Sequence, residues 1–211
     1  RTMGTLVRAC EACRDAALAY GIPFISGKDS LHNQFTNQET GEVLRIPNTL
    51  LISAIGIVDD VRKCVTMDLK KPGSTFCLVR PKDDSLKERI ALHRRLADDI
   101  RAGHVLSCHD VSDGGTLVAA AEMCIASGLG LELDLRVLSM DPLDEVIGVY
   151  LVELNASDPA IPKGLRTHGD ALVLGQVSNE RFLSDGGDFA SDQWKIEVNE
   201  LTAAWRGTLD W

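Results

Sequence analysis

The stretch Val105-Leu106-Ser107-Cys108-His109-Asp110-Val111-Ser112-Asp113-Gly114-Gly115 joins a short apolar run to a helical pattern. Val105 to Cys108 are compact and apolar, as in a strand, whereas Leu117 to Ser127 carry apolar side chains at helical spacing. The polar residues His109 to Gly115 are therefore expected on a turn between a strand and a helix. This order of elements indicates a domain that mixes strands and helices.

The turn carries groups that suit a phosphate and a metal ion. The first N–H groups of a helix lack partners inside the helix and attract anions. Gly114 and Gly115 let the backbone approach an anion closely, and Ser112 adds a hydroxyl. Asp110 and Asp113 supply the hard oxygen ligands that Mg²⁺ prefers. The same residues are also typical of a helix cap with a tight turn, so the spacing alone leaves both interpretations open.

The residues before this stretch predict a helix and several strands. An amphipathic pattern predicts a helix over 2–20, which Gly21 ends, and Leu50 to Val58 predict a long buried strand. Shorter strands are expected over 22–26, 31–35 and 43–46. The charged segment Lys70 to Gly73 contains Pro and Gly, and it is the best candidate boundary between two domains.

Beyond this boundary the pattern predicts further strands and helices. Ser85 to Glu88 form a capping box for a helix that Gly103 ends, and Leu129 to Leu135 alternate like a half-exposed strand. Strands are also expected over 75–79, 149–154, 171–177 and 194–198, and helices after Asp158-Pro159 and around Trp205. Because strands and helices do not alternate regularly, we expect an α+β fold, a mixed β-sheet with helices on one face.

Composition limits the kinds of partner. A net charge of −9 argues against a nonspecific nucleic-acid or membrane surface. No apolar run reaches about 18 residues and no apolar signal core is present, so the chain is expected to be soluble and cytoplasmic. The six cysteines lie mostly in apolar patterns and are expected to be reduced and buried. Cys10 and Cys13 lack the second pair of a metal site, which favours core packing for them.

A second polar cluster, Gly27-Lys28-Asp29-Ser30, has the same character as the turn. It combines glycine for close approach, a cation for phosphate charge, a carboxylate that could hold a metal or the lysine, and a hydroxyl. It lacks the spacing of a Walker A loop, and alone such a cluster is more often a solvated loop. His32 is expected at the surface and His109 bonded to backbone. No pattern of a protein nucleophile stands out, so no catalytic residue is assigned.

Four segments, taken together and in order, resemble one family. Gly21 to Leu31, Pro47 to Val58, Val65 to Asp68 and Cys108 to Met123 closely resemble the C-terminal part of phosphoribosylformylglycinamidine synthase. The resemblance runs nearly end to end. In that family a two-domain unit, shared with aminoimidazole ribonucleotide synthetase, is repeated in tandem, and this chain resembles the last portion of the second copy.

The resemblance implies domains and an activity. Residues 1–69 would be the C-terminal part of a synthetase N-type domain, and residues 74–211 its C-type domain. The family is an ATP-dependent C–N ligase of de novo purine biosynthesis, an amidotransferase in which ATP activates formylglycinamide ribonucleotide. Glutamine-derived ammonia then gives formylglycinamidine ribonucleotide. The resemblance therefore implies Mg²⁺ and ATP or ADP as ligands, formylglycinamide ribonucleotide as substrate, and the remaining synthetase domains and a glutaminase as partners, without nucleic acid or membrane.

Matching residues carry the implied roles. Nucleotide contacts fall on Gly27, Lys28, Asp29, Ser112 and Gly114, the substrate contact on Ser30 and the metal contact on Asp110. The family's main histidine belongs to the first tandem copy, and its Gly-Gly-Ser loop after the strand 75–79 is missing here. The expectation is binding of a nucleotide without turnover by this chain alone. Two alternatives stay open: another enzyme of the same fold, of the aminoimidazole ribonucleotide or selenophosphate synthetase type, or a noncatalytic nucleotide-binding module.

Overall fold

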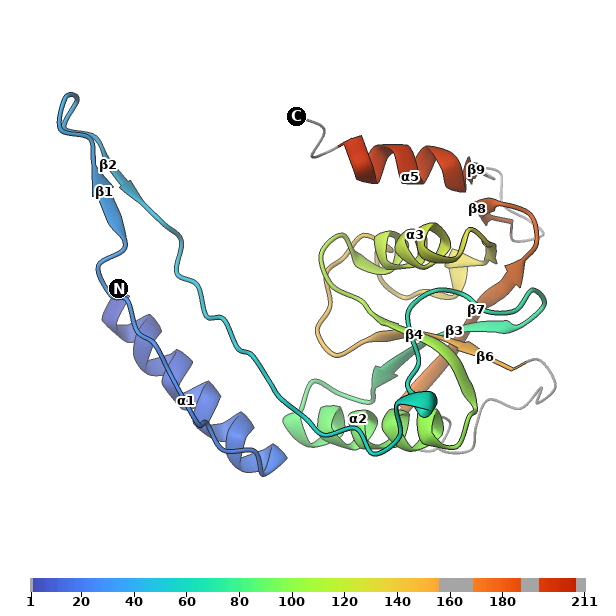
Figure 1. The fold of residues 1–211 in the computed structure, drawn as a ribbon, viewed down its shortest axis with the longest axis horizontal. Coiled ribbons are helices and arrows are strands. Elements are labelled where there is room, and N and C mark those ends of the chain that lie inside the picture. The colour runs from blue at the N-terminus through green and yellow to red at the C-terminus, as the bar shows by residue number, and fades with distance from the viewer. Residues whose placement is uncertain (1, 156–168, 187–193, 208–211) are drawn as a thin grey trace. The chain divides into compact units, whose positions relative to one another are not determined.

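The chain divides after Asp59 into two units, residues 1–59 and 60–211, in a computed structural model that describes residues 2–155, 169–186 and 194–207 (Figure 1). The resemblance assigns residues 1–69 to the first domain, so the division after Asp59 falls ten residues before that predicted boundary. Leu69 is buried in the core of the second unit. The Lys70 to Gly73 segment therefore belongs structurally to the second unit.

The first unit is one helix, one hairpin and extended chain. Helix α1 covers Thr2–Tyr20, as predicted, and Gly21 ends it with a φ of 71°. Strands β1 (Gln34–Thr36) and β2 (Val43–Arg45) pair antiparallel, and Phe35 lies opposite Leu44. This hairpin confirms two of the predicted strands in shortened form.

The apolar segment 50–58 differs from its prediction. It forms no strand, and Leu51, Ile55 and Ile57 expose 86%, 92% and 95% of their surface. The predicted strand over 22–26 is also absent from the assigned strands. A strand needs a hydrogen-bonded neighbour, and the described residues of this unit supply none for either segment. The prediction of a buried strand over 50–58 is therefore wrong for this structure.

A seven-stranded sheet forms the centre of the second unit, in the order β4-β6-β3-β7-β5-β8-β9. The strands are β3 (Thr75–Pro81), β4 (Val105–Asp110), β5 (Gly130–Leu133), β6 (Tyr150–Leu154), β7 (Gly169–Ser178), β8 (Phe182–Asp185) and β9 (Trp194–Glu197). Neighbouring strands are antiparallel except β5 and β8, which are parallel. The mixed sheet is thus confirmed, and β8 is a strand that the sequence pattern did not predict.

Helices cover both faces of this sheet (Figure 1). Helix α2 (Leu86–Arg101) lies on one side, and α3 (Gly115–Ser127) and α5 (Val198–Gly207) lie on the other. Alternate residues of β3 enter the two cores: Phe76 packs in the cluster that contains α3, and Cys77 packs with Leu92 of α2. The α+β class is confirmed, but the helices flank the sheet instead of lying on one face.

The start of α2 and strand β5 follow the sequence pattern closely. The Ser85 hydroxyl accepts the Glu88 N–H at 3.2 Å, which confirms the helix cap. Leu131 and Leu133 are buried and Glu132 is exposed, as the alternation predicted. The helix expected after Asp158-Pro159 lies outside the described residues. In the described part of the chain, no helix is long and apolar enough to span a bilayer.

All six cysteines are free thiols, as expected, but they are not all buried. Cys77 and Cys124 lie in the core, whereas Cys10 and Cys64 are exposed. The expectation that Cys10 packs in a core is wrong for this structure, because the described residues of the first unit contain no buried side chains to receive it.

Candidate nucleotide and metal site

The strand–turn–helix predicted around His109 is present. Strand β4 ends at Asp110, and the Val111 N–H donates to the Val149 carbonyl at 2.9 Å, which fixes the chain as it leaves the sheet. The Gly115 N–H then donates to the Ser112 carbonyl at 3.0 Å and closes the turn. Gly114 is the N-terminal cap of α3 and has no side chain of its own to cap the helix. Any group that caps this helix start therefore comes from elsewhere in the chain or from a ligand.

Both glycines of the turn are required by the backbone itself. Gly114 and Gly115 have φ values of 78° and 72°, a region that residues with a Cβ rarely adopt. A Cβ on Gly114 would lie 2.5 Å from the Val118 Cγ2, and one on Gly115 would lie 2.6 Å from the Leu143 backbone carbon. The close packing therefore gives these glycines a structural role, whether or not an anion binds beside them.

Asp110, Ser112 and Asp113 are exposed polar residues of the turn. The Asp110 side chain is 64% exposed and lies 3.3 Å from Nδ1 of His109, measured to Oδ1. The other ring nitrogen of His109, Nε2, lies 2.9 Å from the Glu122 carboxylate on α3. The expectation that His109 bonds to backbone is therefore wrong, because the side chain of Glu122 reaches it from the neighbouring helix.

Asp110 fits a metal ion that brings its own ligands. Among the described residues, no group of three His, Cys, Asp or Glu side chains converges on one point. Protein Mg²⁺ is often held by one or two carboxylates together with water and substrate phosphates. The two exposed carboxylates of the turn, Asp110 and Asp113, suit Mg²⁺ that arrives with a nucleotide. They do not suit a site built entirely from protein ligands.

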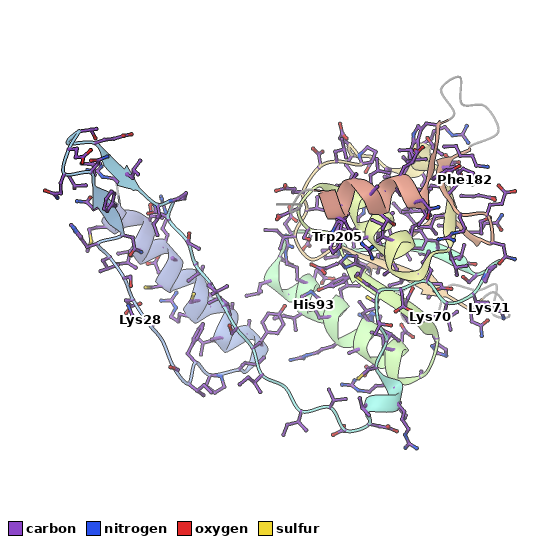
Figure 2. All side chains as sticks on the ribbon, turned by 45° about the horizontal axis from the view of Figure 1, so that its top comes forward. Lys28, Lys70, Lys71, His93, Phe182 and Trp205 are labelled. Carbon is purple, nitrogen blue, oxygen red and sulfur yellow. The ribbon has the colours of Figure 1, made fainter. Side chains whose placement is uncertain are left out.

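The second predicted cluster lies in the first unit, on the extended chain after α1, where Figure 2 labels Lys28. Gly27, Lys28, Asp29 and Ser30 are all exposed. The Lys28 Nζ donates to the Asp29 carbonyl oxygen and to the Ser30 hydroxyl, each at 2.6 Å. The lysine is thus held by its own turn, and the Asp29 carboxylate is not the group that holds it.

Glu145 is a site neighbour that sequence reasoning missed. It belongs to the loop before β6, and its Oε1 accepts the Gly114 N–H at 3.4 Å. In the same loop the Pro142 carbonyl accepts the Leu117 N–H at 3.0 Å. Glu145 is about 30 residues from the turn in sequence, so no local pattern could have indicated the contact.

Glu153 forms a buried polar cluster that the sequence analysis also missed. Its carboxylate is fully buried in β6 and accepts the N–H groups of Lys70 and Lys71, both at 2.8 Å. The hydroxyls of Ser107 and Ser74 lie 2.9 Å and 2.6 Å away. Figure 2 labels the two lysines where the chain enters the domain. A charged residue inside the apolar strand was the one signal in the sequence.

A cavity of about 590 Å³ lies elsewhere on the second unit, on the sheet face formed by β5, β7, β8 and β9. Its walls include Glu132, Phe182 and Lys195, and the Lys195 Nζ lies 3.7 Å from the centre of the Phe182 ring. None of the predicted site residues lines this cavity. Exposure and hydrogen-bonding chemistry at the turn, and not cavity size, therefore support the candidate site.

Comparison with known sequences places the second unit in one family. The family model described as AIR synthase related protein, C-terminal domain, matches residues 61–184. The PurL subunit of phosphoribosylformylglycinamidine synthase from Thermoplasma volcanium is 32% identical over 235 aligned positions, covering 99% of this chain and 30% of that protein. The subunit from Corynebacterium aurimucosum is 30% identical, covering 92% of this chain and 28% of the relative. The chain thus spans less than a third of these relatives.

Solved structures agree on the fold. Thermotoga maritima PurL complexed with FGAR has a TM-score of 0.64 at 14% identity, covering 89% of this chain and 36% of that one. The same protein complexed with ATP has a TM-score of 0.61 at 16% identity, covering 89% of this chain and 34% of that one. The predicted resemblance to the synthase is confirmed by the sequence relatives. The chain belongs to the AIR synthase related family, whose C-terminal domain it carries over residues 61–184.

Proposed function

We propose that this chain supplies part of a nucleotide and Mg²⁺ site to an ATP-dependent ligase that converts formylglycinamide ribonucleotide to formylglycinamidine ribonucleotide in purine biosynthesis. The similarity to PurL subunits over nearly the whole chain supports this activity over other enzymes of the same fold. The observation that carries the binding role is the turn after β4. There two exposed carboxylates, an exposed hydroxyl and the start of α3 lie within five residues, Asp110 to Gly114.

The groups of the turn have distinct roles in this proposal. Asp110 holds Mg²⁺, which neutralises phosphate charge when it is bound. Ser112 and the Gly114 N–H bind phosphate oxygens of the nucleotide. Because no protein nucleophile is assigned, these residues act by binding and orienting charge.

The cluster of the first unit is assigned separately. Gly27, Lys28 and Asp29 contact a nucleotide, and the lysine contributes positive charge to its phosphates. Ser30 contacts the ribonucleotide substrate. The Ser30 hydroxyl, which accepts from Lys28 in the structure, can turn its own proton to a ligand.

Partners follow from the relatives. Thermotoga maritima PurL has been solved with FGAR, with ATP, with ADP and as the assembly PurLQS. We propose for this chain that the remaining synthetase domains complete the site and that a glutaminase supplies ammonia from glutamine. Because no catalytic residue is assigned to this chain, we expect it to bind nucleotide without turnover on its own.

Thermal unfolding with and without ligand tests the proposal. A ligand present at one hundred times its Kd stabilises the folded state by about 2.7 kcal/mol, so ADP with Mg²⁺ should raise the Tm measurably. Asp110→Ala and Lys28→Ala should each reduce this rise. Asp98→Ala, which removes an exposed carboxylate paired with Arg101 on α2, is the matched control and should keep it. No rise for the unsubstituted protein at millimolar ADP and Mg²⁺ would reject the binding role.

A further inference from the structure

The loop before β6 runs along the first turn of α3 and touches it at three successive points. The Pro142 carbonyl accepts the Leu117 N–H at 3.0 Å. The backbone of residues 142–144 packs so closely on Gly115 that a Cβ there would lie within 2.8 Å of three of its atoms. The Glu145 carboxylate then reaches the Gly114 N–H at 3.4 Å. The order of these contacts shows that the loop is docked on the helix start along its length.

Contacts after Glu145 hold the loop in this place. The Val146 side chain packs against the core cluster that contains α3, and Val149 is buried. The Arg89 guanidinium of α2 binds the Ile147 carbonyl and forms an ion pair with Asp84 at 2.9 Å. Because both ends of the segment are fixed, the carboxylate of Glu145 is kept near the helix start.

A carboxylate at this N–H takes the place that a phosphate oxygen would take. The start of a helix favours negative charge, and both groups are anions that accept from the same donor. Asp110 and Asp113 add further negative charge to the same turn. A free phosphate entering the turn must displace Glu145 and approach the other two carboxylates. A divalent cation bound with the phosphate offsets that repulsion.

We propose that Glu145 is a specificity-determining residue that makes anion binding at this turn conditional on a divalent cation. It excludes free phosphates and nucleotides without metal, and it admits the same anions when they carry Mg²⁺. This inference rests on the proposed function, because it concerns the same turn.

Pyrophosphate is the probe that isolates this effect, since it has no base or sugar. Its apparent affinity is measured by thermal shift in EDTA and again with excess Mg²⁺, in about 0.15 M salt, where charges farther apart than roughly 8 Å are screened. In EDTA, Glu145→Gln should bind pyrophosphate about three- to fivefold more tightly than the unsubstituted protein. With Mg²⁺ the difference should shrink to less than about twofold, because the cation offsets the carboxylate.

Asp98→Asn is the matched control, since it removes the same charge from an exposed side chain of α2, on the other face of the sheet. It should change the affinity in EDTA by less than about 1.5-fold, because the sheet lies between α2 and the turn. An equal gain in both variants, or no gain in Glu145→Gln, would overturn the inference. Weaker binding by Glu145→Gln with Mg²⁺ would also overturn it, since Glu145 would then be a metal ligand. Failure of the unsubstituted protein to bind ADP with Mg²⁺ would instead reject the proposed function.

Discussion

A Glu153→Gln substitution should destabilise the fold by about 2–4 kcal/mol, although it hardly changes the side-chain volume. In the structure Oε1 accepts from the Lys71 N–H and Oε2 accepts from the Lys70 N–H. The amide nitrogen of glutamine cannot accept, so in either orientation one of these partly buried N–H groups loses its partner. An unpaired buried donor costs about 1–3 kcal/mol, and the remaining bonds lose the strength that a charged acceptor gives.

The two hydroxyls of the cluster limit the size of this effect. Ser107 can rotate its proton and accept from the glutamine amide. Ser74 lies 2.6 Å from both the Glu153 carboxylate and the Lys71 carbonyl, so it can give its proton to the carbonyl. These adjustments recover part of the loss, which is why the estimate stays near the cost of one unpaired N–H plus weakened bonds.

Urea unfolding followed by tryptophan fluorescence measures the change. With an m value of roughly 2 kcal/mol per molar urea, the midpoint should fall by about 1–2 M. Glu132→Gln is the control, because Glu132 lies on the exposed face of β5 and bonds the Gln176 amide at 3.1 Å. Its effect should stay under about 0.5 kcal/mol. A Glu153→Gln midpoint equal to that of the control would refute the argument that the buried carboxylate stabilises the fold by accepting the Lys70 and Lys71 N–H groups.

Three further predictions concern backbone, thiols and pH. Gly115→Ala should lower the free energy of unfolding by about 1–3 kcal/mol, because φ is 72° and the loop backbone occupies the Cβ position. Gly27→Ala is the control, because there is open space around Gly27, and the same urea titration should show little change in its free energy of unfolding. Burial raises the pKa of the Cys77, Cys108 and Cys124 thiols to about 12. A disulfide reagent at about pH 8 should therefore label Cys10 and the other exposed thiols rapidly, and these three thiols only when the protein unfolds. Hydrogen bonds from Lys70 and, to a smaller extent, from Thr66 hold the pKa of Asp68 below its ordinary value of 3.8. The stability that the Asp68 carboxylate adds is therefore present above its pKa in the unfolded chain, and it is lost as the pH falls through its lower pKa in the folded protein. Asp68→Asn should therefore narrow the difference between urea midpoints at about pH 6 and about pH 2.5, and an unchanged difference would contradict the assignment.

The elements predicted well are those whose signals lie within one turn of chain. The Ser85 cap, the helix α2 that follows it and the strand–turn–helix at Asp110 each depend on residues close in sequence. Strand β8 was missed because it has only four residues, which pair parallel with β5 and antiparallel with β9. Four residues are too few for a strand pattern to stand out in the sequence.

The placement of the helices had a signal that the prediction did not use. Phe76, Cys77, Leu78 and Val79 form a continuous apolar run, and a strand with apolar residues on both sides needs cover on both faces. The structure supplies it with α2 on one face and α3 on the other. The segment 50–58 has the same kind of run and was also predicted as buried. In the described residues, however, it has no partner strand, so an apolar run by itself does not ensure pairing.

The glycines of the turn show which part of a motif identifies a ligand site. Gly114 and Gly115 are explained by positive φ and by the close approach of Val118 and the loop at 142–144, so their presence does not require an anion. Asp110 differs, because its carboxylate is 64% exposed near the helix start, and its neighbour His109 is already bonded to Glu122. The inference of binding therefore rests on the exposed polar residues of the turn. The contact of Glu145 supports this inference further, since its carboxylate already accepts from the Gly114 N–H that a phosphate would use.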